Sequence, residues 1–203
     1  MAPKIVDKEA KKLEILQAAL GVFSQKGVAN TKMIDIATAA SIGKGTIYEY
    51  FKSKEDIFTA GFQHFFNGFE QNIESAVMQS DNPEEQLQIL IRSSLGSFFE
   101  SHADFAIIML DFWAEGIRTK DDTIDEALNL KQVYRMYRGM IVKIIEAGME
   151  KGIFRNVNPV ANASYLIAAI DGLMLQWVME PEIFDIDEVI DAICDVTLKG
   201  LRK

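Results

Sequence analysis

Residues 30–54 read NTKMIDIATAASIGKGTIYEYFKSK, and this pattern predicts two short helices joined by a tight turn. The helices are expected over about 33–40 and 44–51, because Ser41-Ile42-Gly43 between them suits a sharp reversal. We expect the hydroxyl of Thr31 to cap the first helix. The apolar side chains are spaced to form a small shared core, made of Ile36, Ala37, Ala40, Ile42, Ile47 and Phe51. Such a pair is typical of a helix-turn-helix, whose second helix enters the major groove of DNA.

The remaining residues of the second helix favour contact with DNA. Their side chains reach phosphates or base edges, and the glycine lets the backbone approach closely; they are Lys44, Gly45, Thr46, Tyr48 and Tyr50. The same residues also fit a solvated polar face with two tyrosines in the core. The helix pattern alone leaves both interpretations open.

The composition favours an all-α protein with a substantial core. The chain has 203 residues, of which 49% are hydrophobic and only 4 are proline. Helix-forming residues dominate and long alternating β-branched runs are missing, so we expect helices throughout. The length suits one large domain or two small ones.

Charge is distributed unevenly along the chain. Residues 1–54 hold nine Lys or Arg against five Asp or Glu, a net charge of +4, whereas residues 55–203 hold 12 against 25, a net charge of −13. A basic segment on an acidic body is the electrostatic pattern of a DNA-binding domain attached to a different module.

Several classes of protein are disfavoured by what the sequence lacks. It has no 18-residue uncharged apolar run and no secretory signal pattern, and its one cysteine, Cys194, fits a reducing compartment. We therefore expect a cytoplasmic protein without a membrane partner. There are two histidines, no Glu-x-x-His pair, no glycine-rich phosphate loop and no nucleophile elbow. We expect no enzymatic activity, no cofactor and no metal.

Residues 15–58, ILQAALGVFSQKGVANTKMIDIATAASIGKGTIYEYFKSKEDIF, resemble the N-terminal domain of TetR-family transcriptional regulators. The matching features, in order, are Phe-x-x-x-Gly at the end of the first helix, Thr31, Ile36-Ala37, Gly43-x-Gly45-Thr46-Ile47-Tyr48, Tyr50-Phe51 and Lys52-x-Lys54-Glu55. The resemblance implies about nine helices. A three-helix DNA-binding domain over 1–54 would precede an effector-binding and dimerisation domain over 55–203.

The resemblance also implies roles for individual residues. Lys44, Gly45 and Thr46 would face bases or adjacent phosphates. The DNA backbone would be bound by Tyr48, Tyr50 and Lys54, with Thr31 at the start of the preceding helix. Ser41 departs from the family pattern, because glycine is frequent at that position.

The resemblance also implies an effector pocket in the acidic body. The apolar character of the body favours a hydrophobic or amphipathic effector, such as an acyl chain or aromatic compound. The candidate side chains are large and soft with a few polar groups: Phe62, Phe66, Phe98, Ile108, Phe112, Trp113, Tyr134, Tyr137, Arg138, Met174 and Trp177. Arg138, beside the two tyrosines, could receive an anionic group. Ordinary core packing, or a surface ion pair for Arg138, is the alternative for each residue.

The last two helices resemble the family's dimer interface, in which each subunit contributes two helices to a four-helix bundle. The expected contact residues are Leu166, Ile170, Leu173, Trp177, Val189, Ile190, Ile193 and Thr197. A helix fully buried within one chain is the alternative. The hypothesis as a whole is a homodimeric repressor, released from a palindromic operator in double-stranded DNA by a small-molecule effector. The alternative function is a helical ligand-binding or scaffold dimer that has lost DNA recognition.

Overall fold

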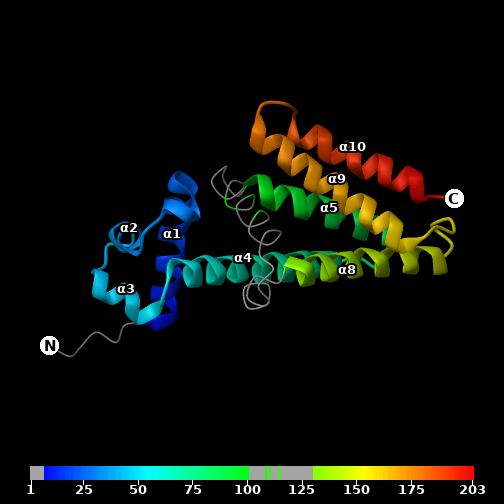
Figure 1. Ribbon diagram of the computed structural model, residues 1–203. Helices are drawn as coiled ribbons and strands as arrows, with labels where there is room; N and C mark the ends of the chain where they lie inside the picture. The colour runs from blue at the N-terminus through cyan, green and yellow to red at the C-terminus, as the bar shows by residue number, and fades with distance from the viewer. Residues whose placement is uncertain (1–6, 101–107, 109, 111–113, 115–129) are drawn as a thin grey trace. The chain divides into compact units, whose positions relative to one another are not determined.

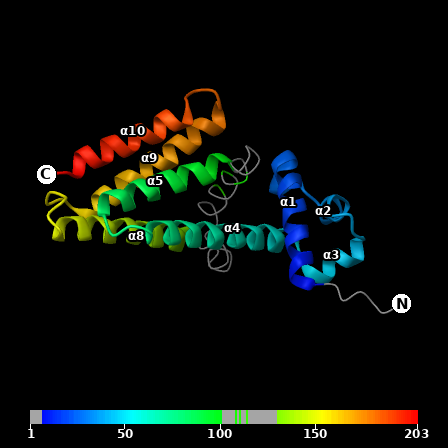
Figure 2. The ribbon, with the colours of Figure 1, turned by 180° about the vertical axis from the view of Figure 1, so that it is seen from behind.

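The computed structural model describes residues 7–100, 108, 110, 114 and 130–203, and its regular elements in these ranges are all helices (Figures 1 and 2). Their bounds are α1 Lys8–Asn30, α2 Met33–Ala39, α3 Lys44–Tyr50, α4 Lys54–Val77, α5 Pro83–Glu100, α8 Leu130–Glu150, α9 Pro159–Met179 and α10 Ile186–Leu201. The predicted all-α class is confirmed.

Local chemistry sets the ends of these helices. The Ser53 hydroxyl accepts a hydrogen bond from the Asp56 N–H at 3.0 Å, and the Asn82 side chain accepts one from the Glu84 N–H at 3.1 Å. Proline occupies the first turn of α9, where its missing N–H costs nothing. Serine and asparagine are preferred N-cap residues, so these boundaries follow from short-range interactions.

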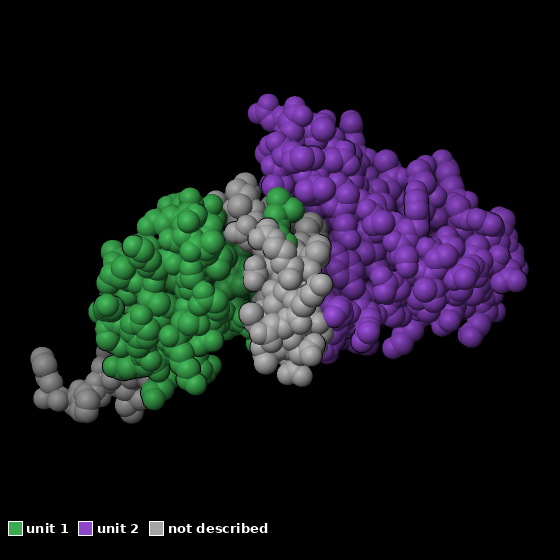
Figure 3. Space-filling model, viewed as in Figure 1, with its two compact units in different colours: residues 1–65, 104–128 green, residues 66–103, 129–203 purple. Residues whose placement is uncertain are grey.

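The chain divides into two compact units, coloured separately in Figure 3. Unit 1 comprises residues 1–65 and 104–128, and unit 2 comprises residues 66–103 and 129–203. The division falls inside α4, eleven residues after the boundary expected at residue 54, and that functional boundary stays a prediction.

Unit 1 contains α1, α2, α3 and the first part of α4. Its core is the one predicted for a helix-turn-helix, with Ile36, Ala37 and Ile47 all completely buried. The rings of Phe23 in α1 and Phe58 in α4 meet edge to face, with centroids 5.7 Å apart. This packing fixes the first part of α4 against α1 within unit 1.

In unit 2, α9 packs on α8, while α5 packs on both α8 and α10 (Figures 1 and 2). The helix α8 ends at Glu150, and Gly152 in the turn that follows has a φ of 70°, which lets the Ile153 N–H reach back to the Gly148 carbonyl at 2.9 Å. The Phe154 ring then lies directly on Gly148. A Cβ at position 148 would sit 2.0 Å from the ring, so only glycine fits there.

Candidate nucleic-acid interface and effector site

The outward face of α3 presents the side chains that the sequence singled out for DNA. Ile47 is completely buried and anchors the helix, whereas Lys44 and Gly45 are exposed and Tyr48 is 48% exposed. Thr46 and Tyr50 are half-buried. No described atom lies within 4 Å of the position that a Cβ on Gly45 would take. The face is therefore open to a large ligand, as the DNA-binding hypothesis requires.

The turn between α2 and α3 explains the departure at Ser41. This residue has a φ of 54°, in the left-handed region that favours glycine. Its conformation lets the Ile42 N–H bond the Ala37 carbonyl at 2.9 Å and the Ser41 N–H bond the Thr38 carbonyl at 3.1 Å. This Schellman-type ending fixes the angle at which α3 leaves α2, and serine holds it at a conformational cost.

Thr31 does not cap α2. The Thr31 side chain is 2% exposed, and its hydroxyl donates to the Gly27 carbonyl at 2.8 Å. Lys32 is the residue that precedes α2, and its N–H donates to the Asp35 carboxylate at 3.0 Å. The predicted capping role is wrong because Gly27, with a φ of 71°, bends α1 and turns its last carbonyls toward Thr31.

Lys54 stabilises the same bend from the far end of the helix-turn-helix. Its ammonium group donates to the carbonyls of Val28 and Ala29, both at 2.7 Å, across 26 and 25 residues of sequence. A cation at the carbonyl end of a helix also interacts favourably with the helix dipole. In this structure the Lys54 ammonium connects the start of α4 to the end of α1 rather than pointing to solvent.

Asp35 is the electrostatic centre of the junction between α1 and α2. Its carboxylate accepts the Lys32 N–H and lies 3.1 Å from the Lys26 ammonium. The backbone hydrogen bond from Lys32, followed by the interaction with Lys26, holds the pKa of Asp35 below its usual value. The ionised carboxylate thus stabilises the start of α2 at neutral pH.

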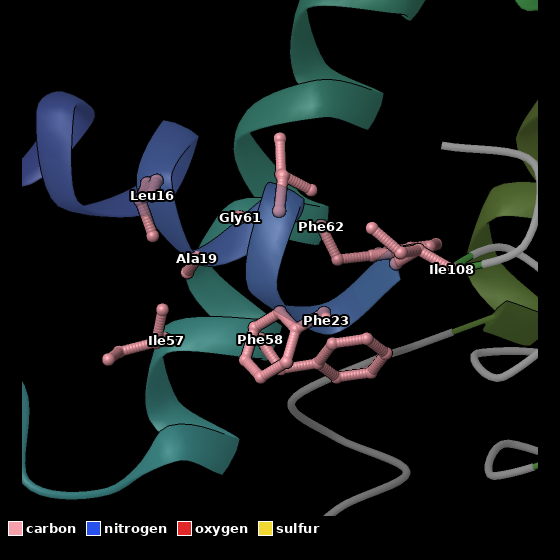
Figure 4. Close-up of a pocket in the computed structure, with 9 residues that line it drawn as sticks. Leu16, Ala19, Phe23, Ile57, Phe58, Gly61, Phe62 and Ile108 are labelled. Atoms are coloured by element: carbon pink, nitrogen blue, oxygen red, sulfur yellow. The ribbon is translucent and has the colours of Figure 1, made fainter. Parts of the chain in front are cut away.

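One apolar cavity lies between α1 and α4 of unit 1 (Figure 4). It includes two of the predicted effector residues, and its lining is Leu16, Ala19, Leu20, Phe23, Ile57, Phe58, Gly61, Phe62 and Ile108. The volume of about 10 Å³ holds roughly one water-sized sphere. A gap of this size is a packing defect and is too small for the expected effector.

The polar effector candidates lie in unit 2, where α5, α8 and α9 meet. The Tyr134 hydroxyl donates to the Asp171 carboxylate at 2.9 Å. The Ser94 hydroxyl donates to the Leu90 carbonyl at 2.6 Å and so accepts the hydrogen bond of Tyr137. Burial, aided by the negative charge of Asp171, raises the pKa of Tyr137 well above its usual range. Tyr137 is therefore a neutral hydrogen-bond donor, and Tyr134 donates to Asp171.

The structure separates the other candidates for the effector site. Arg138 donates from Nε to the Ser164 hydroxyl at 3.1 Å, so this partner is neither of the two that the sequence suggested, an anionic ligand or a surface ion pair. Phe66 and Met174 are half-buried in unit 2, and Trp177 is buried. The side chain of Phe98 and the whole of Phe112 and Trp113 lie outside the described residues.

Comparisons with known proteins identify the family. Residues 15–60 match the bacterial regulatory proteins of the tetR family, and residues 83–202 match the C-terminal domain of BetI-type transcriptional repressors. The second match spans more than half of the chain. This chain belongs to the TetR family. The prediction of a DNA-binding transcription regulator, rather than an enzyme, is therefore confirmed.

Individual relatives of this TetR-family chain are also regulators. The fatty acid metabolism regulator protein of Bacillus subtilis is 22% identical over 196 residues, which cover 96% of this chain and 97% of that protein. The repressor NicS of Pseudomonas putida is 29% identical over 157 residues, or 77% of this chain and 71% of NicS. The crystal structure of FadR from B. subtilis with stearoyl-CoA has the same fold, with a TM-score of 0.78, 23% identity and coverage of 93% and 98%.

The predicted dimer residues of this TetR-family chain differ in how far they are buried within the chain. Leu166, Ile170, Trp177 and Ile190 are 2, 5, 8 and 5% exposed and belong to the interior of unit 2. Leu173, Val189, Ile193 and Thr197 are half-buried. The most exposed apolar residues of these two helices lie elsewhere: Val160, Tyr165, Leu175, Met179 and Val196. A largely apolar helix hides which of its faces is buried within the chain, so the sequence alone did not separate these two sets, and the dimer contacts stay a prediction.

Two functional candidates were missed by sequence reasoning, Ser94 and Asp171. Ser94 carries no distinguishing signal, since serine is common in helices of every kind. Asp171 does, because it is the only charged residue in the 21 residues of α9. Burying a single carboxylate in a helix whose other residues are all uncharged costs free energy, so its presence indicates a specific role.

Proposed function

We propose that this TetR-family chain is a repressor that binds a palindromic operator through α3. The supporting observation is the open face of α3 around Lys44, Gly45 and Tyr48, held on a helix that Ile47 anchors in the core. In this proposal Thr46 and Tyr50 complete the contact set, with phosphate contacts supplying affinity and base-edge contacts supplying specificity. Thr31 and Lys54 hold the helix-turn-helix in position through their hydrogen bonds to carbonyls at the end of α1.

The same proposal includes a homodimer, since a palindromic operator matches a two-fold symmetric protein. The supporting feature is a face of α9 at three- and four-residue spacing, formed by the exposed Tyr165, Ala168, Leu175 and Met179 with the half-buried Gly172 among them. The exposed apolar residue Val196 lies on α10, beside α9 in both ribbon views (Figures 1 and 2). Covering these side chains with a second copy would remove a sizeable apolar surface from water.

The third part of the proposal is release by a small hydrophobic or amphipathic effector bound in unit 2. The effector would need to prefer a conformer in which the two DNA-binding domains of the dimer no longer match the half-site spacing. Equal affinity for both conformers would leave their populations unchanged. No helix in the described ranges is long and apolar enough to cross a membrane. We place the protein in the cytoplasm, where its DNA target is.

Gel retardation with the DNA upstream of the protein's own gene tests this function. We expect a shift whose apparent affinity falls steeply with salt, because Lys and Arg contacts release counterions from phosphate. The variant Lys44→Ala should weaken the complex, and Tyr48→Phe should reduce affinity without unfolding the protein. A folded dimer that shifts no DNA at low salt would instead support the scaffold alternative.

A further inference from the structure

The carboxylate of Asp171 occupies an unusual position in unit 2. It is half-buried on α9, and one of its oxygens, Oδ2, accepts the Tyr134 hydroxyl. Among the described residues no Lys, Arg or His forms an ion pair with it. In those same residues its one hydrogen-bond partner is the Tyr134 hydroxyl, whereas a carboxylate can accept about four hydrogen bonds.

This arrangement costs stability, because a carboxylate that leaves water needs a compensating positive charge or several donors. Burial raises the pKa of Asp171 above its usual value, and the hydrogen bond from Tyr134 only partly opposes the effect. Sites that retain an uncompensated charge are found where a ligand supplies the compensation. Within the described part of the chain, Asp171 therefore has no positively charged partner.

The neighbouring groups favour a cation as that partner. The Tyr134 hydroxyl reaches the carboxylate, and Tyr137, three residues along α8, is close enough for the charge of Asp171 to raise its pKa. The faces of such aromatic rings attract ammonium groups. Both hydroxyl protons are already donated, to Asp171 and to Ser94. Arg138, on the same helix as both tyrosines, donates to Ser164. The net charge of −13 over residues 55–203 would also raise the local concentration of cations.

We propose that Asp171, with the rings of Tyr134 and Tyr137, binds a positively charged amine or quaternary ammonium group of the effector. The proposal rests on the effector-binding part of the proposed function and gives that effector a charge. It reverses the expectation of an anion at Arg138. The apolar remainder of the effector would contact the half-buried Met174, one helical turn from Asp171.

Three probes of equal chain length test the proposal by titration calorimetry without DNA: decyltrimethylammonium, decanol and decanoate. The wild-type protein should bind the ammonium probe at least tenfold more tightly than the other two. The isosteric variant Asp171→Asn should lose that preference while its affinity for decanol stays unchanged. The matched control is Asp187→Asn, an exposed carboxylate on α10, which should behave like the wild type.

Thermal melting of the ligand-free proteins provides a second readout. Asp171→Asn should melt at the same temperature as the wild type or higher, because it removes a half-buried charge and still accepts the Tyr134 hydroxyl. A lower melting temperature would mean that the carboxylate is structural and would contradict the proposal. Tightest binding of decanoate, no binding of the ammonium probe, or an unchanged preference in Asp171→Asn would also overturn it.

Gel retardation separates this inference from the proposed function. If the protein shifts operator DNA but shows no preference for the ammonium probe, the repressor stands and the cation site falls. If the ammonium probe binds through Asp171 but the protein shifts no DNA, the cation site stands and the repressor falls. Loss of the DNA complex on adding decyltrimethylammonium, but not decanoate, would support both.

Discussion

Replacing Lys54 with methionine tests what this residue does in the DNA-binding domain. The variant keeps the aliphatic stem and removes an ammonium group that donates two hydrogen bonds of 2.7 Å to the carbonyls of Val28 and Ala29. Hydrogen bonds to a charged group each contribute roughly 1.5–3 kcal/mol, and less where solvent has access, as it has here. We therefore expect a loss of about 2 kcal/mol in the stability of the bent end of α1.

The same loss should appear in operator binding. If DNA binding requires the bend that Lys54 holds, about 2 kcal/mol corresponds to roughly a 30-fold weaker complex for each head. The dependence of log affinity on log salt should stay unchanged, because no phosphate contact is removed. A lysine that neutralised a phosphate would instead contribute about 0.9 to that slope, or about 1.8 for a dimer. Fluorescence anisotropy over a salt series measures both quantities.

Two further variants make the comparison decisive. Lys52→Met removes the exposed lysine two residues earlier. Its ammonium forms no hydrogen bond or ion pair within the described residues, so the melting temperature should stay unchanged. Lys54→Arg keeps the charge and should recover most of the stability. The reasoning is refuted if Lys54→Met melts like the wild type and its salt slope falls by about 1.8.

Four other outcomes follow from the structure. Gly148→Ala should destabilise the protein by about 2–4 kcal/mol, seen in urea unfolding, because its Cβ would overlap the buried Phe154 ring. Gly139→Ala in the same helix meets no described atom and should instead stabilise it by about 1 kcal/mol; similar effects for both would contradict the packing. Ser41→Gly should raise the melting temperature, by up to about 1 kcal/mol in stability, since it relieves the left-handed backbone, whereas Ser41→Val should lower it. Leu175→Arg should yield monomers in sedimentation velocity and weaken operator binding, while Glu146→Arg on the exposed face of α8 should remain dimeric. Because the pKa of Asp35 is lowered in the folded state, its contribution is complete above the ordinary value of 3.8 and is lost as the pH falls below it. The stability gap between wild type and Asp35→Asn should therefore shrink in acid, and a gap that widened would exclude the assigned role.

The sequence alone determined the helix-turn-helix and the class of the protein. Periodic apolar residues such as Ile36 and Ile47 identified the small core, and Ser53, Asn82 and Pro159 marked helix starts. These features depend on hydrogen bonds and packing within a few residues, so their chemistry is visible in a short window. The family resemblance through Lys54 then supplied the DNA-binding function.

The tertiary structure decided which side chains meet over long distances. Lys54 reaches Val28 across 26 residues, and Tyr134 reaches Asp171 across 37, and neither separation carries a local signal. The buried face of α9 was equally hidden, because a helix with a single charged residue offers apolar side chains in every direction. Local pattern specifies where helices begin and end, whereas partners, burial and the uncompensated carboxylate depend on how the helices pack.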